Sequence, residues 1–558
     1  MLVRLTIAIT TAGLLIHALS FSTRHAKPAS APEGTAAPCA STFVLRKAMF
    51  LPGCIPGDGC RRLTNLAVAQ RACASLPACG GVTSAGPSSF ELRSASRPAD
   101  SPVNETTWTL RPCPTRLGSK VLSGAPRRTG LAASSARTPP RGWSSWNCLR
   151  GGPTQAKLSA VMRVMATQRR SVLGKAQRLL SLADLGYVNV GLDDGWQLCG
   201  APGVEERAYH LASGHPVVDA RKFPDLGSMV GLAHRLGLRS GFYVNNCLCS
   251  EHSLRTPEAV ALAMERTAEA IVSLGFDAVK IDSCGELKNL SRWRELLGPT
   301  VAVENCFQGG LVPTNSTLPA IMSDPRGASH PNVEIAQSNN GCSGALEEEQ
   351  CPYQYYRTSA DIDVTWESVM ANLISAVAFS GDKPLLSRPG LWAYPDMLVV
   401  GFLPTAVEDR SHFGAWAVLS SPLTLSFDLT DTATLDRVWP IISNVHLLRV
   451  NAAWAGSPGR LVRATAEHML FAKPLGGGEH AVFVLATGST STSVEIRMPD
   501  VVGTTDDQTV VRVLDAYDDA RDLGQTLVEG RAFATGPIEP RDSRFYLFVS
   551  TVRRVTHS

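Results

Sequence analysis

Short apolar strands alternate with amphipathic helices between residues 137 and 448, and this alternation constrains the fold more than any other feature. For example, strand-like 187–194 and 238–245 flank a helix-like segment that begins after Asp225 and ends at Gly237. Such alternation is typical of a parallel β/α fold. About eight repeats in roughly 310 residues predict a closed (β/α)8 barrel. An open doubly wound sheet is the alternative, but no Gly-x-Gly-x-x-Gly follows the first strand, which disfavours a dinucleotide fold.

The remaining expected elements follow from periodicity and from helix caps. Barrel strands are expected at 142–147, 187–194, 238–245, 276–284, 300–305, 353–358 and 396–401, with helices after Asp225 and Thr256 and at 291–297, 366–379 and 412–420. Beyond residue 449 a period of two predicts an antiparallel β-sandwich over 449–558, with strands at 460–474, 480–487, 493–498, 509–516 and 544–549.

Two segments precede the 137–448 barrel, and the first is rich in cysteine. Six cysteines between positions 39 and 113 frame a small module, in which Leu66, Ala69 and Cys73 predict one helix. Its segment 72–83 resembles the helix-then-strand core of PAN/apple-like modules, and that resemblance implies binding of glycans or proteins. A disulfide-stapled spacer is the alternative. Residues 114–136 are expected to be a linker.

The N-terminus indicates the secretory pathway. Residues 1–21 contain one early arginine and an apolar run, which predicts a signal peptide, with an uncleaved signal anchor as the alternative. In that setting the 14 cysteines predict disulfides, and sequons at Asn104, Asn289 and Asn315 are compatible with a glycoprotein. We therefore expect an extracellular or lysosome- or vacuole-like location, with membrane attachment only through an uncleaved anchor. The formal charge of +4 forms no basic block and gives no case for nucleic acid.

The segment Lys280-Ile281-Asp282 stands at the end of a predicted strand. Alternate side chains of a strand share a face, so Lys280 and Asp282 are expected to point the same way. An ammonium group beside a carboxylate keeps it ionised and therefore nucleophilic. A purely structural salt bridge is the alternative for this pair alone.

Other polar side chains follow the remaining predicted strands, and a barrel brings such strand ends to one pocket. The carboxylates are Asp193, Asp194, Asp282, Glu304, Asp361 and Asp396; the cations are Lys280 and Arg357; the aromatic residues are Trp143, Trp146, Trp196, Tyr243 and Trp392. Carboxylates bind hydroxyl groups and aromatic rings pack on apolar sugar faces, so this set predicts a neutral sugar as ligand. Two carboxyl groups about 5–5.5 Å apart would serve a retaining glycosidase.

A metal site is the rival interpretation of a carboxylate cluster. No histidine accompanies these strand ends, and neither a His-x-x-x-His pair nor a calcium loop is present in the sequence. In an oxidising compartment Cys247 and Cys249 are better explained by disulfides than by metal binding. The sequence therefore predicts neither a metal nor a cofactor.

The same strand ends resemble the melibiase-type glycoside hydrolases, family 27, which comprise α-galactosidases and their relatives. The likeness is carried by 137–147 (RTPPRGWSSWN), 187–196 (YVNVGLDDGW), 237–243 (GLRSGFY), 279–284 (VKIDSC) and 356–362 (YRTSADI), and it extends through 395–398 and 413–429. The resemblance implies a TIM barrel followed by a β-sandwich. It also implies an activity, a secreted retaining α-galactosidase that cleaves terminal α-linked galactose.

Residue roles follow from the same resemblance. Asp282 matches the nucleophile and Asp361 the general acid/base, while Cys284 matches one half of a disulfide near the pocket, with Cys249 or Cys247 as partner. The expected sugar-binding residues are Trp146, Asp193, Asp194, Tyr243, Lys280, Glu304, Arg357 and Asp396. Arg357 is a puzzle, because a cation near Asp361 opposes its role as an acid.

Departures from the family pattern concern the substrate. The fifth strand ends in Glu304-Asn305-Cys306 instead of Cys-Glu-Trp, so the residue that contacts the sugar's 2-substituent is open. α-N-acetylgalactosaminidase or β-L-arabinopyranosidase specificity is one alternative, and a glycan-binding protein without turnover is another. The expected partners are an oligosaccharide, glycolipid or glycoprotein glycan, and a homodimer is left open.

Overall fold

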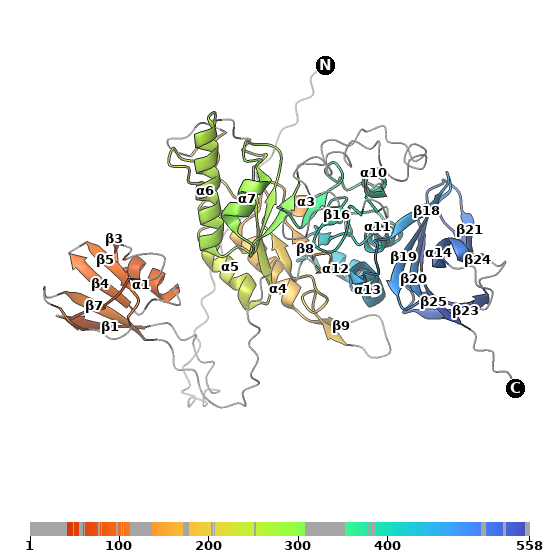
Figure 1. Cartoon of the computed structure of the whole chain (residues 1–558), viewed down its shortest axis with the longest axis horizontal. Coiled ribbons are helices and arrows are strands. Elements are labelled where there is room, and N and C mark those ends of the chain that lie inside the picture. The colour runs from red at the N-terminus through yellow and green to blue at the C-terminus, as the bar shows by residue number, and fades with distance from the viewer. Residues whose placement is uncertain are drawn as a thin grey trace, which may run out of the picture. The chain divides into compact units, whose positions relative to one another are not determined.

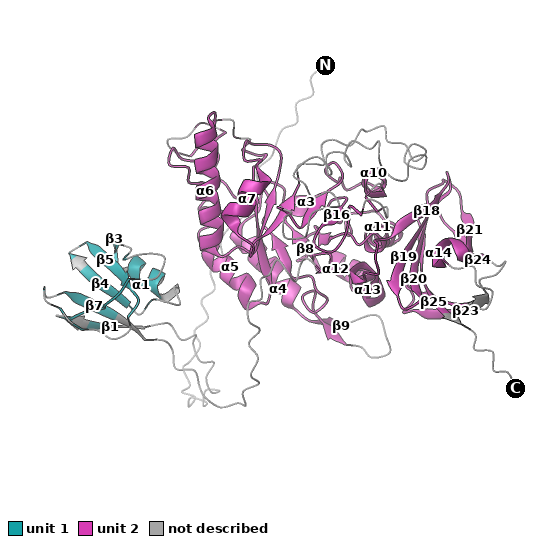
Figure 2. Ribbon diagram, viewed as in Figure 1, with its two compact units in different colours: residues 1–125 teal, residues 126–558 magenta. Residues whose placement is uncertain are grey.

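The computed structural model describes residues 42–111, 137–306 and 352–552, apart from short gaps within each range. The chain divides into two compact units, residues 1–125 and 126–558, drawn in teal and magenta in Figure 2. Each unit has a hydrophobic core of its own. The predicted signal segment, the linker 114–136 and the sequons at Asn104 and Asn315 lie outside the described residues.

The first unit is a small antiparallel sheet with one helix. Its five strands, in the order β1-β7-β4-β5-β3, are β1 (Thr42–Lys47), β3 (Arg62–Leu63), β4 (Gly81–Gly86), β5 (Ser89–Arg93) and β7 (Thr106–Arg111), and β2 (Met49–Phe50) pairs with β6 (Ala99–Asp100). The predicted helix is confirmed as α1 (Leu66–Ser75). Cys73 at its end forms a disulfide with Cys79, and Cys54 forms one with Cys60.

The second unit begins with an eight-stranded parallel barrel, visible in yellow to cyan in Figure 1. Its strands are β8 (Arg141–Ser144), β11 (Asn189–Gly191), β12 (Arg239–Val244), β13 (Ala278–Ile281), β14 (Ala302–Asn305), β15 (Tyr355–Arg357), β16 (Trp392–Tyr394) and β17 (Leu423–Leu425). β17 pairs with β8, and a parallel bridge between Leu398 and Leu425 joins β17 to the chain after β16. The predicted (β/α)8 barrel is confirmed.

Two predictions near the end of the barrel are wrong: the strand at 396–401 and an unbroken helix over 413–429. Residues 396–401 are not a strand, because the seventh strand is β16 and Asp396 lies beyond it with a positive φ of 73°. The segment 413–429 is not one helix: the helix ends at Val418, Ser420 has a φ of 57°, and Pro422 leads into β17. A proline and a left-handed residue both stop a helix, and this allows the eighth strand to follow.

Helices cover the barrel, and most of them begin at side-chain caps. They are α3 (Trp146–Leu149), α4 (Gln155–Ala166), α5 (Leu226–Arg235), α6 (Pro257–Leu274), α7 (Leu290–Leu297), α10 (Trp366–Val377), α11 (Ala406–Val418), α12 (Thr432–Ile442) and α13 (Val445–Ala452); a short hairpin, β9 (Arg169–Arg170) and β10 (Leu179–Leu180), follows α4. As predicted, Asp225 caps α5, Thr256 caps α6 and Gly275 ends α6 in the left-handed conformation.

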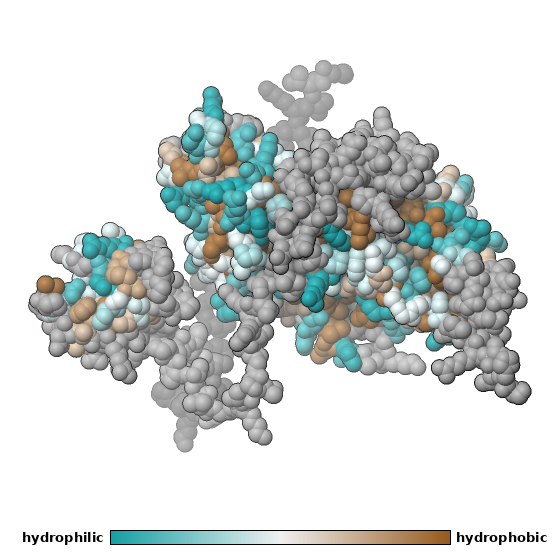
Figure 3. Space-filling model, in the orientation of Figure 1, coloured by the Kyte–Doolittle hydropathy of each residue, from teal (hydrophilic) through white to brown (hydrophobic). Residues whose placement is uncertain are grey.

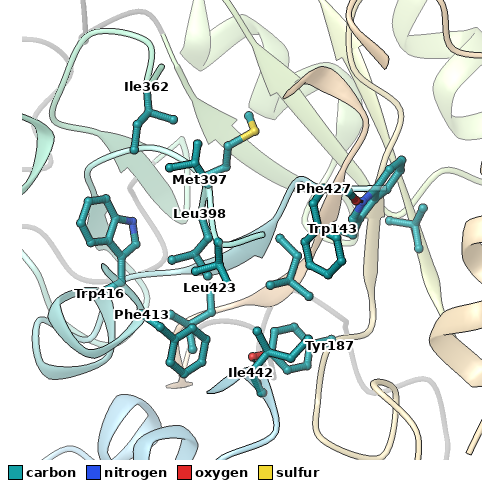
Figure 4. Close-up of a cluster of buried hydrophobic side chains, with 14 of the residues drawn as sticks. Trp143, Tyr187, Ile362, Met397, Leu398, Phe413, Trp416, Leu423, Phe427 and Ile442 are labelled. Carbon is teal, nitrogen blue, oxygen red and sulfur yellow. Dashed lines mark hydrogen bonds between the residues drawn. The ribbon is translucent and has the colours of Figure 1, made fainter. Parts of the chain in front are cut away.

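Large aromatic side chains fill the space between these helices and the strands (Figure 4). Trp416 of α11 lies below Ile362 and Met397 in that view, and its indole N–H donates to the Asp396 carbonyl at 2.8 Å. Trp143 and Tyr187 likewise donate to main-chain carbonyls at 2.8 Å. These three aromatic residues therefore bury apolar area without leaving their polar atoms unpaired.

The C-terminal domain contains a six-stranded and a two-stranded antiparallel sheet. The first, in the order β18-β19-β20-β25-β22-β23, contains β18 (Arg460–Ala464), β19 (His468–Gly476), β20 (Glu479–Ala486), β22 (Thr509–Asp515), β23 (Arg521–Leu527) and β25 (Ser543–Val552); the second pairs β21 (Thr492–Arg497) with β24 (Ala532–Ile538), and α14 (Met498–Val502) follows β21. The sequence analysis missed β23 and β24, whose polar and glycine residues obscure the period of two.

The six-stranded sheet is buried on both faces at its centre. Along β19, Met469 and Phe471 belong to the core shared with the barrel, whereas Leu470 and Ala472 belong to the core beneath β21 and β24. The strand period of two produces this division. A side chain at Gly414 of α11 would lie 2.8 Å from the Phe483 ring, so this glycine permits a close approach of helix and sheet.

Two buried cations hold the end of α13 against the barrel and the sheet. Arg141 of β8 donates to the Leu448 carbonyl, and Lys473 of β19 donates to the carbonyls of Val450 and Asn451. Cations at a helix C-terminus satisfy its free carbonyl groups and oppose its negative dipole end. This helix end therefore connects the first barrel strand to the C-terminal domain.

Hydrophilic and hydrophobic residues are interspersed over the described surface in the view of Figure 3. Among the described residues, no helix combines the length and the apolar character needed to cross a bilayer.

Lys473 makes a prediction about stability and pH. Burial lowers the pKa of its ammonium to about 7, whereas an unfolded lysine titrates near 10.4. Between these values the unfolded chain binds more protons, so Lys473 contributes stability at high pH that is lost as pH falls toward about 7. We expect the free energy of unfolding of wild type, relative to Lys473→Met, to rise between about pH 6 and about pH 9 in denaturant titrations. Exposed Lys288→Met is the matched control, and a pH-independent difference for Lys473→Met would contradict the prediction.

Candidate active site

Strand register brings a row of polar side chains to one level inside the barrel. Tyr243 pairs with Lys280, Lys280 with Glu304, and Glu304 with Tyr355, on four successive strands. Side chains two residues further along point the same way, so Asp282 and the residues level with it form the next layer toward the carboxyl ends. Below the row the barrel encloses a cavity of about 80 Å³, where glycines on β8, β11 and β12 leave space. The row is therefore the floor of the candidate pocket.

Lys280 pairs with Asp193 rather than with Asp282, which corrects the predicted Lys280–Asp282 bridge. Its Nζ lies 3.0 Å from Asp193 Oδ2; the Asp193 side chain is buried, and the Lys280 side chain is 13% exposed. Asp282 lies one layer higher and reaches past this ammonium. Burial acts to lower the pKa of Lys280, but the charges of Asp193 and its neighbours raise it well above its ordinary value. Lys280 is therefore a fixed positive charge beneath the pocket.

Two donors hold the Asp282 carboxylate. The Tyr243 hydroxyl donates to Oδ2 at 2.6 Å, and the Ser283 backbone N–H donates to Oδ1 at 2.7 Å. Burial, with the charges of Asp282 and Asp193, raises the pKa of Tyr243 well above its ordinary value, so the phenol keeps its proton. Both hydrogen bonds fix the orientation of the Asp282 side chain.

The loop after β13 is fixed to the end of β12. Asn245, with a φ of 63°, donates to the Asp282 carbonyl and accepts from the Leu287 N–H at 2.9 Å. A disulfide joins Cys247 to Cys284. Of the two partners that the sequence left open for Cys284, Cys249 is wrong, since it pairs with Cys199. Register explains the partner: Val244 lies opposite Ile281, so the residues three further along each strand meet.

Asp361 lies at the mouth of the barrel, with 72% of its side chain exposed, and forms an ion pair with Arg357. Partial enclosure acts to raise the pKa of the Asp361 carboxyl, but the charges of Arg357 and Lys280 and the Arg357 hydrogen bond outweigh it, and the pKa is lowered. The predicted conflict between Arg357 and an acid role is thus present in the free protein. The same guanidinium lies 3.5 Å from Asp396.

Asp194 and Asp396 are buried and bind main-chain amides. Asp194 accepts from the N–H groups of Cys247 and Leu248 at 2.8 Å each and from the Gln197 amide at 2.6 Å. Asp396 accepts from the N–H of Ile362 at 2.9 Å. Burial raises the pKa of both carboxyls above the ordinary value, against these donors and nearby cations. The structure places both residues as anchors of the loops that border the pocket.

Glu304 lies level with Lys280 and accepts from the Tyr394 hydroxyl. Burial raises its pKa to about 7, although the charge of Lys280 opposes the shift. Cys306, which directly follows β14, is a buried free thiol whose pKa burial raises well above its ordinary value. On this side of the pocket the structure therefore places a carboxyl group with a pKa near 7, Glu304, and an uncharged thiol, Cys306.

The predicted aromatic surface is only partly present. Trp143, Trp196 and Trp392 are fully buried in the core, and the indole of Trp196 donates to the Tyr243 carbonyl at 2.9 Å. Trp146 is partly exposed at the start of α3, where Arg150 stacks over its ring at 5.5 Å. Of the tryptophans expected at the pocket, Trp146 is the one placed where a ligand could pack on it.

One group of three potential metal ligands lies in this region, but two of the three cannot bind a metal. Cys247, Asp282 and Cys284 have ligand atoms within 4.8 Å of one another. Both sulfur atoms belong to one disulfide, so neither is a thiolate, and thiolates are the metal-binding form of cysteine.

Two positioning residues had no role in the sequence analysis. Tyr394 binds Glu304 from β16, and the spacing Trp392-x-Tyr394 would have placed it on the inward face once the strand was located correctly. Asn245 clamps the Asp282 loop; an asparagine just after a strand is a known signal for the left-handed conformation.

Comparisons with known proteins agree with this geometry. A profile of the family described as "Alpha galactosidase A" matches residues 329–452. An α-galactosidase of Cyamopsis tetragonoloba is 28% identical over 407 residues, 71% of this chain and 83% of that protein. An α-N-acetylgalactosaminidase of Mus musculus is 27% identical over 340 residues, 60% of this chain and 72% of that protein. The crystal structure of α-galactosidase I from Mortierella vinacea is similar in fold, with a TM-score of 0.57 and 20% identity, covering 75% of this chain and all of that one.

The Lys280–Asp193 pair makes a prediction about stability. In Lys280→Met the Asp193 carboxylate stays buried without its counter-charge, and breaking a buried pair costs about 3 kcal/mol or more. We expect a lower denaturation midpoint for Lys280→Met, and partial recovery in Lys280→Met/Asp193→Asn, because the second change removes the unpaired charge. If the double variant were less stable than the single one by the full cost of Asp193→Asn alone, the two side chains would not be coupled.

Proposed function

We propose that this chain, a melibiase-type glycoside hydrolase of family 27, is a retaining α-galactosidase that acts by double displacement. The observation that carries the proposal is the position of Asp282: its carboxyl group lies at the carboxyl end of β13, held by hydrogen bonds from Tyr243 and Ser283 near the fixed charge of Lys280. The similarity to α-galactosidases along most of the second unit supports galactose as the sugar.

In the first step Asp282 attacks the anomeric carbon of the galactoside. A covalent bond forms between a carboxylate oxygen and that carbon while the bond to the leaving oxygen breaks. Asp361, protonated, delivers its proton to the leaving oxygen, so the aglycone departs as an alcohol. Asp361 is two strands from Asp282, on the loop after β15, and its exposed carboxyl can face both the leaving group and water.

In the second step Asp361, now ionised, takes a proton from a water molecule. That water attacks the anomeric carbon, the bond to Asp282 breaks, and galactose leaves with its original anomeric configuration. The enzyme returns to its starting state, with Asp282 ionised and Asp361 protonated.

The other residues divide into sugar contacts and loop anchors. We assign Lys280, Asp193 and Glu304 to hydroxyl groups of the bound sugar and Trp146 to its apolar face. Tyr243 orients the nucleophile. Asp194, Asp396 and Arg357 act mainly on the loops around the pocket, because their polar atoms are engaged with main-chain groups and with Asp361.

The substrate class is an oligosaccharide with a terminal α-galactose, and glycolipid or glycoprotein glycans belong to the same proposal. Four disulfides among the described residues favour an oxidising compartment, so we place the enzyme on the secretory route.

Hydrolysis of nitrophenyl glycosides by wild type and by Asp282→Asn tests the function. We expect release from the α-galactoside by wild type and a loss of about 10⁴-fold or more in kcat for Asp282→Asn, because an amide is not a nucleophile here. Equal release by both proteins would reject Asp282 as the nucleophile. Preferential release from an α-N-acetylgalactosaminide or a β-L-arabinopyranoside would assign that specificity to the enzyme in place of galactose. No release from any glycoside would favour a glycan-binding protein.

The pH dependence of kcat/KM tests the role of Asp361. Asp361 must be protonated in the free enzyme to act as the acid, and its pKa is lowered. We therefore expect kcat/KM to fall as pH rises, and this fall should begin within the acidic range. Arg357→Gln removes the cation that lowers the pKa of Asp361 most, so it should move this decline to higher pH. Arg150→Gln, which removes a weaker contribution, should move it less. A decline unchanged in Arg357→Gln would argue against Asp361 as the acid.

A further inference from the structure

We propose that a groove between α10 and the C-terminal domain binds the leaving-group part of extended neutral α-galactosides. This groove, here called the α10 groove, has a volume of about 900 Å³. Trp366, Glu367 and Met370 of α10 line one side, and Thr487, Ser489 and Arg541 line the other. The inference rests on the proposed function and adds the substrate class, since a pocket for one galactose unit alone would not need this groove.

The α10 groove opens on the same face of the barrel as the candidate pocket. α10 follows β15, and a helix after a barrel strand starts at the carboxyl ends of the strands. Trp366, its first residue, is five residues from Asp361. Five residues span at most about 18 Å, so the groove begins within a few sugar units of the acid that protonates the leaving oxygen.

The far wall consists of three loops of the C-terminal domain, which follow β18, β20 and β24. Arg541 on the last loop has a φ of 66°, an uncommon conformation for a residue with a side chain. Its guanidinium lies 2.7 Å from Glu408 of α11 and 3.3 Å from Glu367. These contacts tie the loop to the first turns of two barrel helices, so both walls of the groove are held together before a ligand binds.

The chemistry of the α10 groove favours a neutral sugar chain. Its charged side chains, Glu367 and Arg541, face each other, so the described lining offers no unpaired charge to an acidic or basic partner. The remaining lining combines hydroxyl groups of Thr487 and Ser489 with the apolar surface of Met370. Hydroxyl groups and apolar surface are what an oligosaccharide requires, and the volume suits a ligand of several rings.

Galactosides with leaving groups of increasing length test the inference. After loss of the terminal galactose, the leaving groups of melibiose, raffinose and stachyose contain one, two and three sugar units. A nitrophenyl α-galactoside has no sugar in its leaving group and reports on the pocket alone. Ser489 is exposed, so Ser489→Trp should fill the groove without disturbing the core, and Thr490→Trp, on an exposed neighbour that does not line it, is the matched control. We expect Ser489→Trp to raise KM for stachyose about tenfold. The nitrophenyl galactoside should be unaffected, as should every substrate with Thr490→Trp.

The possible failures are distinguishable. If wild type hydrolyses galactosides and Ser489→Trp treats the whole series like wild type, the α10 groove does not contact the leaving group, and the proposed function stands. If wild type hydrolyses no α-galactoside, both proposals are overturned. If Ser489→Trp also loses activity on the nitrophenyl substrate, Met370→Ala is the deciding variant, because it removes apolar contact without adding bulk. A rise in KM confined to stachyose would then support the role of the groove, and an unchanged KM would reject it.

Discussion

The ion pair between Lys280 and Asp193 is the interaction on which the interior of this barrel depends. An ammonium group inside a closed sheet is strongly unfavourable unless a counter-charge and further donors accompany it. Asp193 supplies that charge and is itself held by the Ser144 hydroxyl at 3.1 Å. Asp282 lies one layer above this cation and is among the carboxylates that raise the pKa of Lys280. The cost of this arrangement falls on Asp361, since the same positive field opposes its protonation.

Main-chain hydrogen bonds give the pocket its shape. Asp194, Asn245 and Asp396 each follow a barrel strand and each bind amide or carbonyl groups of a neighbouring loop. Asn245 and Asp396 adopt left-handed backbone conformations to do so, which is a cost of about 1 kcal/mol or more that surrounding contacts must offset. Strain of this kind is common where side chains must be oriented in advance of ligand binding. Asp282, the proposed nucleophile, is thus held by residues that do not themselves react.

The sequence predicted the barrel, most of its strands and helices and the residues at the strand ends, because period and capping are local signals. It was less successful where long-range geometry decides. The partner of Lys280 could not be found from spacing, since Asp193 lies 87 positions earlier and meets it only through register across β11, β12 and β13. Strand register likewise determines that Cys284 pairs with Cys247 and not with Cys249. The short strand β17 was hidden in an apolar run that looked helical, and periodicity alone does not separate the two. Trp143 and Trp196 show that an aromatic residue beside a motif can belong to the core.

The double-sided burial of β19 and β20 limits how such a chain can be recombined. The first unit has a core and disulfides of its own. The C-terminal sheet has no such independence, because Phe471 and Phe483 complete the core of the barrel. In chimeras and natural fusions, barrel and sheet should therefore be inherited together, and a junction placed between them would separate two halves of one core.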